Sequence, residues 1–324
     1  MVKHLALIAI ACGACGTFED PDVVIDLRIL SITADPPEQV IDISQTQEPL
    51  QLVKQLVPAK VCALVADPNF DRRLRYTLTV CNLGSGERCD LAAPHVVLAD
   101  TLADDPDLTV PEPQLCATIP ADLDLMAIIL TALDVDSLHG LGGVYYGVEL
   151  KIGGETADPA LDLYASKNLV VQPKIPDTRT ANQNPTLSGI QATIDGGLDS
   201  PVDLHRCADN PNPVALTPGQ KVRFTPIEPD GAREVYTVPT LDGMFRTFTE
   251  SLTYQWVLGD GHVSNDSTGG PHDPFGNPAP LFTDFTAPSA DALMAMPEDI
   301  PLWVIQRDER LGAAWFETCI RVTP

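Results

Sequence analysis

The chain has 324 residues, and its 45 Asp and Glu residues against 20 Lys and Arg give a formal net charge of −25 at pH 7. This balance argues against nucleic acid as a partner, because phosphate contacts need clustered Lys and Arg. The 30 prolines and 22 glycines argue against an all-α fold. Since the length also exceeds the usual size of one hydrophobic core, we expect two β-rich domains.

The N-terminus has the layout of a bacterial export signal. Lys3 precedes a short apolar run, residues 5–11, and small residues then surround two cysteines. The run is far shorter than the roughly 20 residues that span a bilayer. With a cysteine at its end, the segment resembles a lipoprotein signal, whose cysteine is freed by cleavage and acylated. This resemblance implies a membrane-anchored protein of the cell envelope.

Two cysteines compete for the acylated position, and an alanine precedes each of them. The residues before Cys12 suit cleavage better, whereas cleavage before Cys15 leaves an even number of cysteines that can all pair. We therefore predict acylation at Cys15 and keep Cys12 as the alternative. Residues 1–15 are then the signal peptide and residues 16–22 a tether. Gly16, rather than Asp, follows the cysteine, and by the Gram-negative sorting tendency this favours the outer membrane, with the body facing the periplasm or the surface.

Residues 23–172 are predicted to form an immunoglobulin-like β-sandwich. Period-2 alternation and β-branched residues predict its strands, which are residues 23–33, 59–66, 72–81, 144–152 and 167–172. One short helix is expected at residues 122–133, where apolar residues recur at i, i+3 and i+4 spacing. The polar, Pro-containing residues 173–187 predict an extended linker to the second domain.

The acidic part of the first domain, residues 89–136, has no Lys or Arg. Pairs of aspartates, such as those in residues 104–107, could supply oxygen ligands for calcium. However, the EF-hand spacing of acidic residues and glycine is missing. We interpret the region as a solvated acidic loop followed by a helix face, predict no cofactor, and keep calcium as the alternative.

Residues 188–324 are predicted to form a second sandwich, with strands at residues 187–194, 220–227, 233–238, 251–258 and 301–307. Tyr254 to Gly261 reads Y-x-W-x-x-G-D-G and resembles the signature of PKD-type immunoglobulin-like domains, and residues 302–322 resemble their final hairpin. The resemblance implies that Trp256 fills the space between two sheets. Residues 264–288 depart from the family and predict a long Gly/Pro loop. As a whole, the chain resembles two-domain lipoproteins of Gram-negative envelopes, a group that implies a location and no activity.

The three tryptophans all lie in this second domain. A Trp on a strand with alternating apolar neighbours normally packs in the core. Trp315, just after a presumed turn, is the candidate exception and could contact a sugar.

Six cysteines remain after the signal, and no pair has a zinc-finger spacing. Cys81 and Cys89 flank a turn-rich stretch that can bring two strand ends together, so this is the best-founded disulfide. Cys62 with Cys116 and Cys207 with Cys319 would complete the set, although six cysteines allow 15 pairings.

Catalytic motifs are missing from the sequence. It has no H-E-x-x-H, G-x-S-x-G or S-x-x-K pattern. One acid and imidazole cluster stands out: Asp260, His262, Asp266, His272 and Asp273. It lies in a Gly/Pro-rich stretch, so we interpret it as turn chemistry and predict no metal site.

We therefore expect a membrane-anchored, non-catalytic interaction or scaffold module that faces an envelope protein or a glycan. The alternative is a carbohydrate-binding or calcium-dependent adhesion module.

Overall fold

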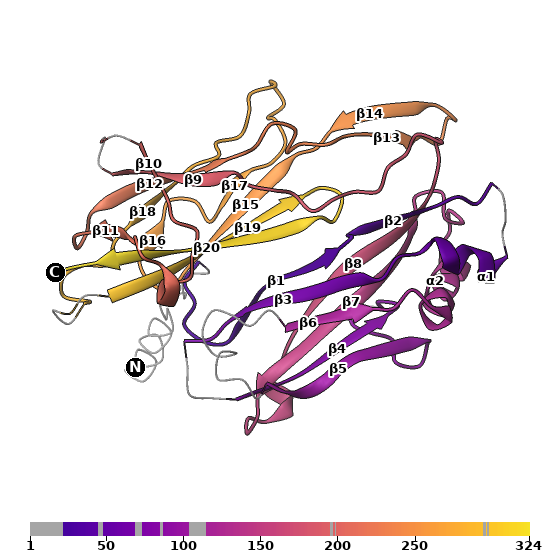
Figure 1. Ribbon diagram of the computed structural model, residues 1–324, viewed down its shortest axis with the longest axis horizontal. Coiled ribbons are helices and arrows are strands. Elements are labelled where there is room, and N and C mark those ends of the chain that lie inside the picture. Colours follow the sequence, from indigo (N-terminus) through magenta and orange to yellow (C-terminus); the bar gives the residue numbers. More distant parts are fainter. Residues whose placement is uncertain are drawn as a thin grey trace, which may run out of the picture.

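The computed structural model describes residues 22–44, 48–68, 73–84, 87–103, 115–194, 197, 199–293, 296 and 298–324. Both candidate acylation cysteines, the signal peptide, tether residues 16–21 and the aspartates of residues 104–107 lie outside the described residues. The described chain is all-β with few short helices, and its two sandwiches lie side by side (Figure 1), which confirms the predicted fold class. No helix in these ranges is long and apolar enough to cross a bilayer.

Two sheets build the first sandwich. The three-stranded sheet has the order β1-β3-β6, with β1 Arg28–Asp35, β3 Ala59–Ala66 and β6 Leu115–Ile119. The five-stranded sheet has the order β2-β8-β7-β4-β5, with β2 Glu38–Ile41, β8 Leu163–Pro173, β7 Val144–Gly154, β4 Leu74–Cys81 and β5 His95–Ala103. Side chains of both sheets and one face of α2 (Leu123–Val135) form the first hydrophobic core.

The predicted helix is present, and its start has a local cause. The side chain of Asp122 accepts hydrogen bonds from the backbone N–H groups of Asp124 and Leu125, which caps the first turn of α2. Leu125, Ile128 and Ile129 then lie buried in the core. A second short helix, α1 (Pro49–Leu52), was not expected.

Strand β3 shows why one apolar run is almost completely buried. Val61, Ala63 and Val65 face the first core, whereas Leu64 and Ala66 face the second domain. A strand that is covered on both faces has a near-continuous hydrophobic run instead of an alternating one. The sequence Ala-Lys-Val-Cys-Ala-Leu-Val-Ala of this strand is such a run.

Two expectations for the first domain were wrong. The part of residues 89–136 that precedes the helix is not a single loop, because it includes β5 and β6. Among the described strands β5 pairs with β4 alone and forms the edge of its sheet, so its exposed and half-buried positions give a weak apolar pattern. The predicted strand at residues 23–33 is shorter, since β1 begins at Arg28 and Val23 pairs with Leu258 of the second domain.

The second sandwich has two five-stranded sheets. One has the order β10-β9-β12-β18-β16, with β10 Asp199–Pro201, β9 Gly189–Ile194, β12 Lys221–Ile227, β18 Thr283–Thr286 and β16 His262–Val263. The other has the order β11-β20-β19-β15-β17, with β11 Val214–Leu216, β20 Ala313–Val322, β19 Glu298–Asp308, β15 Leu252–Leu258 and β17 Ser267–Gly269. A separate two-stranded ribbon consists of β13 (Val235–Pro239) and β14 (Phe245–Thr249). Three short 3₁₀ helices complete the described elements, at Val53–Gln55, Pro159–Leu161 and Cys207–Asp209.

Trp256 lies at the centre of the second core. It is fully buried and stacks on Phe224 of the opposite sheet, with ring centroids 6.5 Å apart. Its indole Nε1 donates to the hydroxyl of Thr268 on β17 at 2.9 Å, as a buried indole requires. The expectation of one long loop at residues 264–288 was wrong, because this segment includes β17 at the edge of one sheet and β18 between β12 and β16 of the other.

Three disulfides join the cysteine pairs that the sequence analysis suggested: Cys62–Cys116, Cys81–Cys89 and Cys207–Cys319. The first links directly opposite residues of β3 and β6. Disulfides persist in oxidising compartments, so these bonds indicate a location outside the cytoplasm.

The two sandwiches share an apolar joint. It consists of Val24, Leu30, Leu64 and Ala66 from the first part of the chain, and Val257, Trp303, Ile305 and the half-buried Trp315 from the second domain. We call this set the apolar joint. The backbone also crosses between the domains, since the N–H of Val24 donates to the carbonyl of Leu258 at 2.8 Å. The domains are thus packed together and not only linked.

Candidate functional site

A buried cluster of charged side chains lies beside the apolar joint, where both domains meet the linker. Glu38 of β2 is only 2% exposed. Its carboxylate accepts hydrogen bonds from Arg179 Nη2 and the Asn182 backbone N–H, both at 2.7 Å, and from Arg310 Nη2 at 2.5 Å. One carboxylate therefore ties the first domain, the linker and the turn after β19 together. We call the joint network the set Glu38, Arg179, Asn182, Glu234, Glu250, Asp308 and Arg310.

Two further acids of this network have raised pKa values. Arg310 Nη1 lies 3.2 Å from Glu234 and 3.3 Å from Glu250. Burial, and then the nearby Asp308, raise the pKa of Glu250 to about 7. Burial also raises the pKa of Glu234. A single arginine thus faces three carboxylates, and desolvation disfavours the charged form of the carboxylates.

The side chain of Lys167, on β8 of the first domain, contacts the second domain. Its ammonium donates to the carbonyl of Leu311 in the turn between β19 and β20. Burial lowers the pKa of Lys167 to about 8, although the negative charge of Asp308 opposes this shift. Asn184 of the linker makes a similar bridge, since its amide donates to Ala34 O at 2.7 Å and accepts from the Ala313 N–H at 3.0 Å.

Perturbed carboxylates and a lysine with a lowered pKa are also found in catalytic sites, so the space around them decides their role. The hollow beside Arg179, Arg310 and Tyr236 has a volume of about 70 Å³, enough for roughly two waters. The charged groups are already bound to one another and to backbone atoms of both domains. We interpret the joint network as a structural element whose hydrogen bonds and ion pairs fix the orientation of the two sandwiches relative to each other.

Trp315, the sequence-predicted ligand contact, lies on β20 and is half-buried. One part of it packs at the apolar joint. It also lines a hollow of about 260 Å³ with the side chains of Leu204, His205, Arg206, Asp209, Phe316 and Glu317. A half-buried indole beside polar and charged groups is an arrangement that can stack on a sugar ring.

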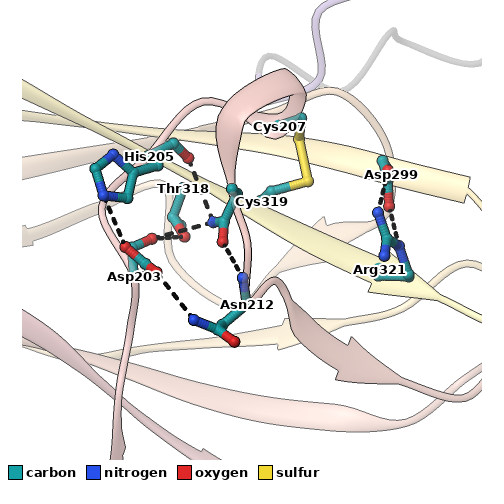
Figure 2. The surroundings of a disulfide bond; sticks show 9 residues. Asp203, His205, Cys207, Asn212, Asp299, Thr318, Cys319 and Arg321 are labelled. Carbon is teal, nitrogen blue, oxygen red and sulfur yellow. Dashed lines mark hydrogen bonds and ion pairs between the residues drawn. A yellow bond between two sulfur atoms is a disulfide. The ribbon is translucent and has the colours of Figure 1, made fainter.

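The segment that contains His205, one of the residues lining this hollow, is attached to β20 (Figure 2). His205 Nε2 lies 3.2 Å from the carboxylate of Asp203, and the hydroxyl of Thr318 donates to Asp203 O at 2.7 Å. The disulfide Cys207–Cys319 fastens the same segment to β20. The residues beside Trp315 are therefore preorganised.

A second hollow, of about 300 Å³, opens at the domain boundary and is mainly apolar. Val24, Ala66 and Pro68 line it from one side, and Ile300 and Trp303 line it from the other. The indole Nε1 of Trp303 is buried and has no hydrogen-bond partner among the described residues. The hollow belongs to the packing of the joint, and Asp67, Glu298 and Asp299 are the acidic residues in its lining.

The remaining sequence candidates have local roles. Asp136 accepts from the N–H groups of Leu138 and Gly140, and these bonds lower its pKa. Asp273 caps its own turn by accepting from the N–H groups of Phe275 and Asn277. Among the described residues, no group of three or more His, Cys, Asp or Glu side chains could hold a metal ion. Calcium stays a prediction, because residues 104–107 lie outside the described ranges.

The ribbon β13–β14 carries an exposed apolar surface that the sequence analysis missed. Leu241 and Met244 at its tip are 83% and 63% exposed, and Phe245 and Phe248 are also exposed. Only residues 233–238 were predicted as a strand. Asp242-Gly243, followed by the Phe- and Thr-containing residues 245–249, is the hairpin signal that could have revealed the second strand.

The base of the ribbon is fixed to the joint network. Tyr236 stacks on Phe248 with ring centroids 5.7 Å apart, and its hydroxyl donates to Glu309 at 2.7 Å. The guanidinium of Arg310 lies 4.6 Å from the centre of the Tyr236 ring, within cation–π range. Contacts of Tyr236 therefore hold the base of the ribbon against the second domain.

Comparisons with known proteins give no family. The chain matches no protein-family model and no curated protein sequence. Among solved structures it is similar to a transglutaminase of red sea bream, with 8% identity and a TM-score of 0.24 over 93% of this chain and 32% of that one. It is also similar to the α2-macroglobulin of E. coli, with 10% identity and a TM-score of 0.20 over 92% of this chain and 17% of that one. The chain thus spans a third or less of the length of these structures.

Proposed function

We propose that the protein is a lipid-anchored, non-catalytic module of the cell envelope that binds a partner through the ribbon β13–β14. The observation that carries this proposal is the exposed apolar surface of the ribbon. Soluble monomeric proteins rarely expose contiguous apolar patches, and such patches mark interaction sites. Leu241 and Met244 lie in the turn of the ribbon, Phe245 and Phe248 lie on β14, and all four side chains are exposed to solvent.

The rigid body behind the ribbon supports a scaffold role. The joint network and the apolar joint fix the two sandwiches to each other, and Tyr236 links the ribbon to Arg310 of that network. A partner that binds a rigid element loses less free energy to ordering than one that binds a mobile loop. The signal-like N-terminus and the three disulfides support a location in the envelope.

Crosslinking in cells tests the ribbon as the interaction surface. A tagged, full-length copy is compared with the double variant Leu241→Ser/Met244→Ser, which changes only exposed side chains. We expect the variant to lose the crosslinked complexes that the unchanged chain forms. The control is Leu161→Ser, which removes a 74% exposed side chain of the first domain. Complexes that survive in the ribbon variant would refute this surface.

The lipid anchor has its own test. We expect the intact mass of the membrane-extracted protein to include acyl chains on Cys15, and Cys15→Ala to release the protein from membranes. Unchanged attachment of that variant, together with release by Cys12→Ala, would move the anchor to Cys12.

A carbohydrate site at Trp315 is the second candidate function, favoured by the preorganised hollow of about 260 Å³ beside this side chain. Its test is binding to a glycan array, with Trp315→Ala expected to abolish any signal. Phe275→Ala, which removes a 90% exposed aromatic side chain away from the hollow, is the control. Equal binding by both variants would exclude Trp315 as the contact.

A further inference from the structure

The hydrogen-bond pattern of the ribbon determines which backbone groups point outward. The N–H of Glu250 donates to Glu234 O, and the N–H of Thr240 donates to Met244 O. Hydrogen-bonded and non-hydrogen-bonded pairs alternate along an antiparallel ladder. The odd-numbered residues of β14, which are 245, 247 and 249, therefore direct their N–H and C=O groups away from β13. None of these groups has a backbone partner within the described ranges.

The two edges of the ribbon are not equivalent. The β13 edge contains Pro239, which has no N–H to donate. Val235 and Thr237 of β13 also line the small hollow against Pro176 and Thr178 of the linker. β14 lies on the outer side of the ribbon (Figure 1), and all five of its residues are exposed. The β14 edge is thus the open one.

The sequence of β14, Phe-Arg-Thr-Phe-Thr, is complementary to itself in antiparallel orientation. With Thr247 on a two-fold axis, Thr247 lies opposite its own copy and Phe245 lies opposite Thr249. Arg246, the one charged residue of the strand, then lies opposite Phe248, so that no like charges meet and two cation–π pairs form. The outward groups of residues 245, 247 and 249 complete the ladder between the two strands.

We propose that the partner of the ribbon is a second copy of this chain, which adds its β14 antiparallel to the first and makes a continuous four-stranded sheet. This inference rests on the proposed role of the ribbon as the interaction surface. The resulting contact is isologous, as in most homodimers. It removes the exposed strand edge, which is otherwise a liability for uncontrolled association.

The small size of the contact predicts where the dimer forms. Two five-residue strands and their apolar side chains bury less than the roughly 1,200 Å² of a stable interface, so we expect weak association in dilute solution. Two anchored copies on one membrane meet at a much higher effective concentration. The dimer should therefore be measured on the full-length, membrane-bound protein.

A cysteine on the two-fold axis provides the test. Directly opposite, hydrogen-bonded residues have Cα atoms about 5.5 Å apart, so Thr247→Cys brings two thiols within reach of a short thiol-to-thiol crosslinker. The control is Thr237→Cys, whose copies would lie about 14 Å apart, three strand spacings across the sheet. Both variants lose the same 3.1 Å contact between the Thr237 and Thr247 hydroxyls, which matches their effect on folding.

We expect the crosslinker to give a covalent dimer of Thr247→Cys in membranes and to leave Thr237→Cys monomeric. Arg246→Glu in the Thr247→Cys chain should reduce the dimer, because it removes the cation–π pairs. A Thr247→Cys chain that is folded and stays monomeric overturns the homodimer. If Leu241→Ser/Met244→Ser still abolishes crosslinks in cells, the ribbon then binds a different protein and the proposed function stands without self-association.

Discussion

At the scale of single residues, Glu250 is a member of the joint network whose burial is unfavourable for its charged form. It is 3% exposed, lies 3.3 Å from Arg310, and shares this arginine with Glu234 and Glu38. A buried carboxylate that must share its cation is only partly compensated for the loss of water. Burial therefore raises the pKa of Glu250 to about 7 from an ordinary value of 4.5.

This raised pKa gives the folded protein a defined pH dependence. Between pH 4.5 and 7 the folded state binds more protons at Glu250 than the unfolded state, so the free energy of unfolding falls as the pH rises through this window. We expect Glu250→Gln to remove this dependence, which is on the order of 3 kcal/mol for a shift of this size. Urea unfolding of the full chain at several pH values between 4 and 8 measures the effect.

Glu228 provides a contrast of opposite sign. Burial opposes its ionisation, but hydrogen bonds from Arg233 and Tyr254 outweigh this and lower its pKa. Its contribution to stability is present above pH 4.5 and disappears as the pH falls through the folded-state pKa. Glu228→Gln should therefore lower the free energy of unfolding above pH 4.5 and remove this pH dependence in the acid range. For Glu250→Gln, a pH profile of the free energy of unfolding that equals that of the unchanged chain would contradict the prediction, because it would mean that Glu250 is ionised throughout.

At the scale of elements, the disulfides differ in how much chain they close. Cys81–Cys89 closes 8 residues and Cys207–Cys319 closes 112. The chain-entropy relation assigns about 2.5 kcal/mol to the short loop and about 5 kcal/mol to the long one. We expect Cys207→Ala/Cys319→Ala to lower the free energy of unfolding about twice as much as Cys81→Ala/Cys89→Ala. Equal losses in chemical denaturation would show that native packing, and not loop closure, sets the contribution of each bond.

The elements that sequence analysis located are those whose pattern is local. β3 was predicted with its observed limits because its apolar run is continuous, and α2 was predicted because its apolar residues recur at helical spacing. β5 and β14 were missed, since edge and ribbon strands bury little and need few apolar residues. Neither strand has the continuous or regularly alternating apolar run that identified β3.

The candidate site depends on contacts that no local pattern contains. Glu38 meets Arg179 across 141 positions of the chain and Arg310 across 272. Residues 173–187 were predicted as a linker from Pro and polar composition, but the same polar side chains also bind both domains. The role of Trp315 was predicted only as an exposed platform, and its contact with the apolar joint follows from the packing of whole domains.

At the scale of the whole molecule, the apolar joint should make the two sandwiches unfold together. β15 and β19 present one face to the core of the second domain and the other face to the first domain, as the neighbours Val304 and Ile305 show. The second domain thus contributes one wall of a shared interior. Domains that share a large apolar interface lose the independent motion expected of linked domains.

Two valines on opposite faces of this sheet allow the contributions of the apolar joint and of the second core to be tested separately. Val257 is 1% exposed and belongs to the apolar joint, whereas Val304 is 0% exposed and belongs to the core of the second domain. Val257→Ala and Val304→Ala remove the same atoms, and each should cost about 1–3 kcal/mol of packing free energy. The number of unfolding transitions should depend on which contact is lost.

We expect calorimetry of Val304→Ala to show one transition at a lower temperature. Val257→Ala should split the transition in two, because the domains no longer stabilise each other. A single transition in both variants would show that the joint network alone couples the domains, and independent transitions in the unchanged chain would show that neither does.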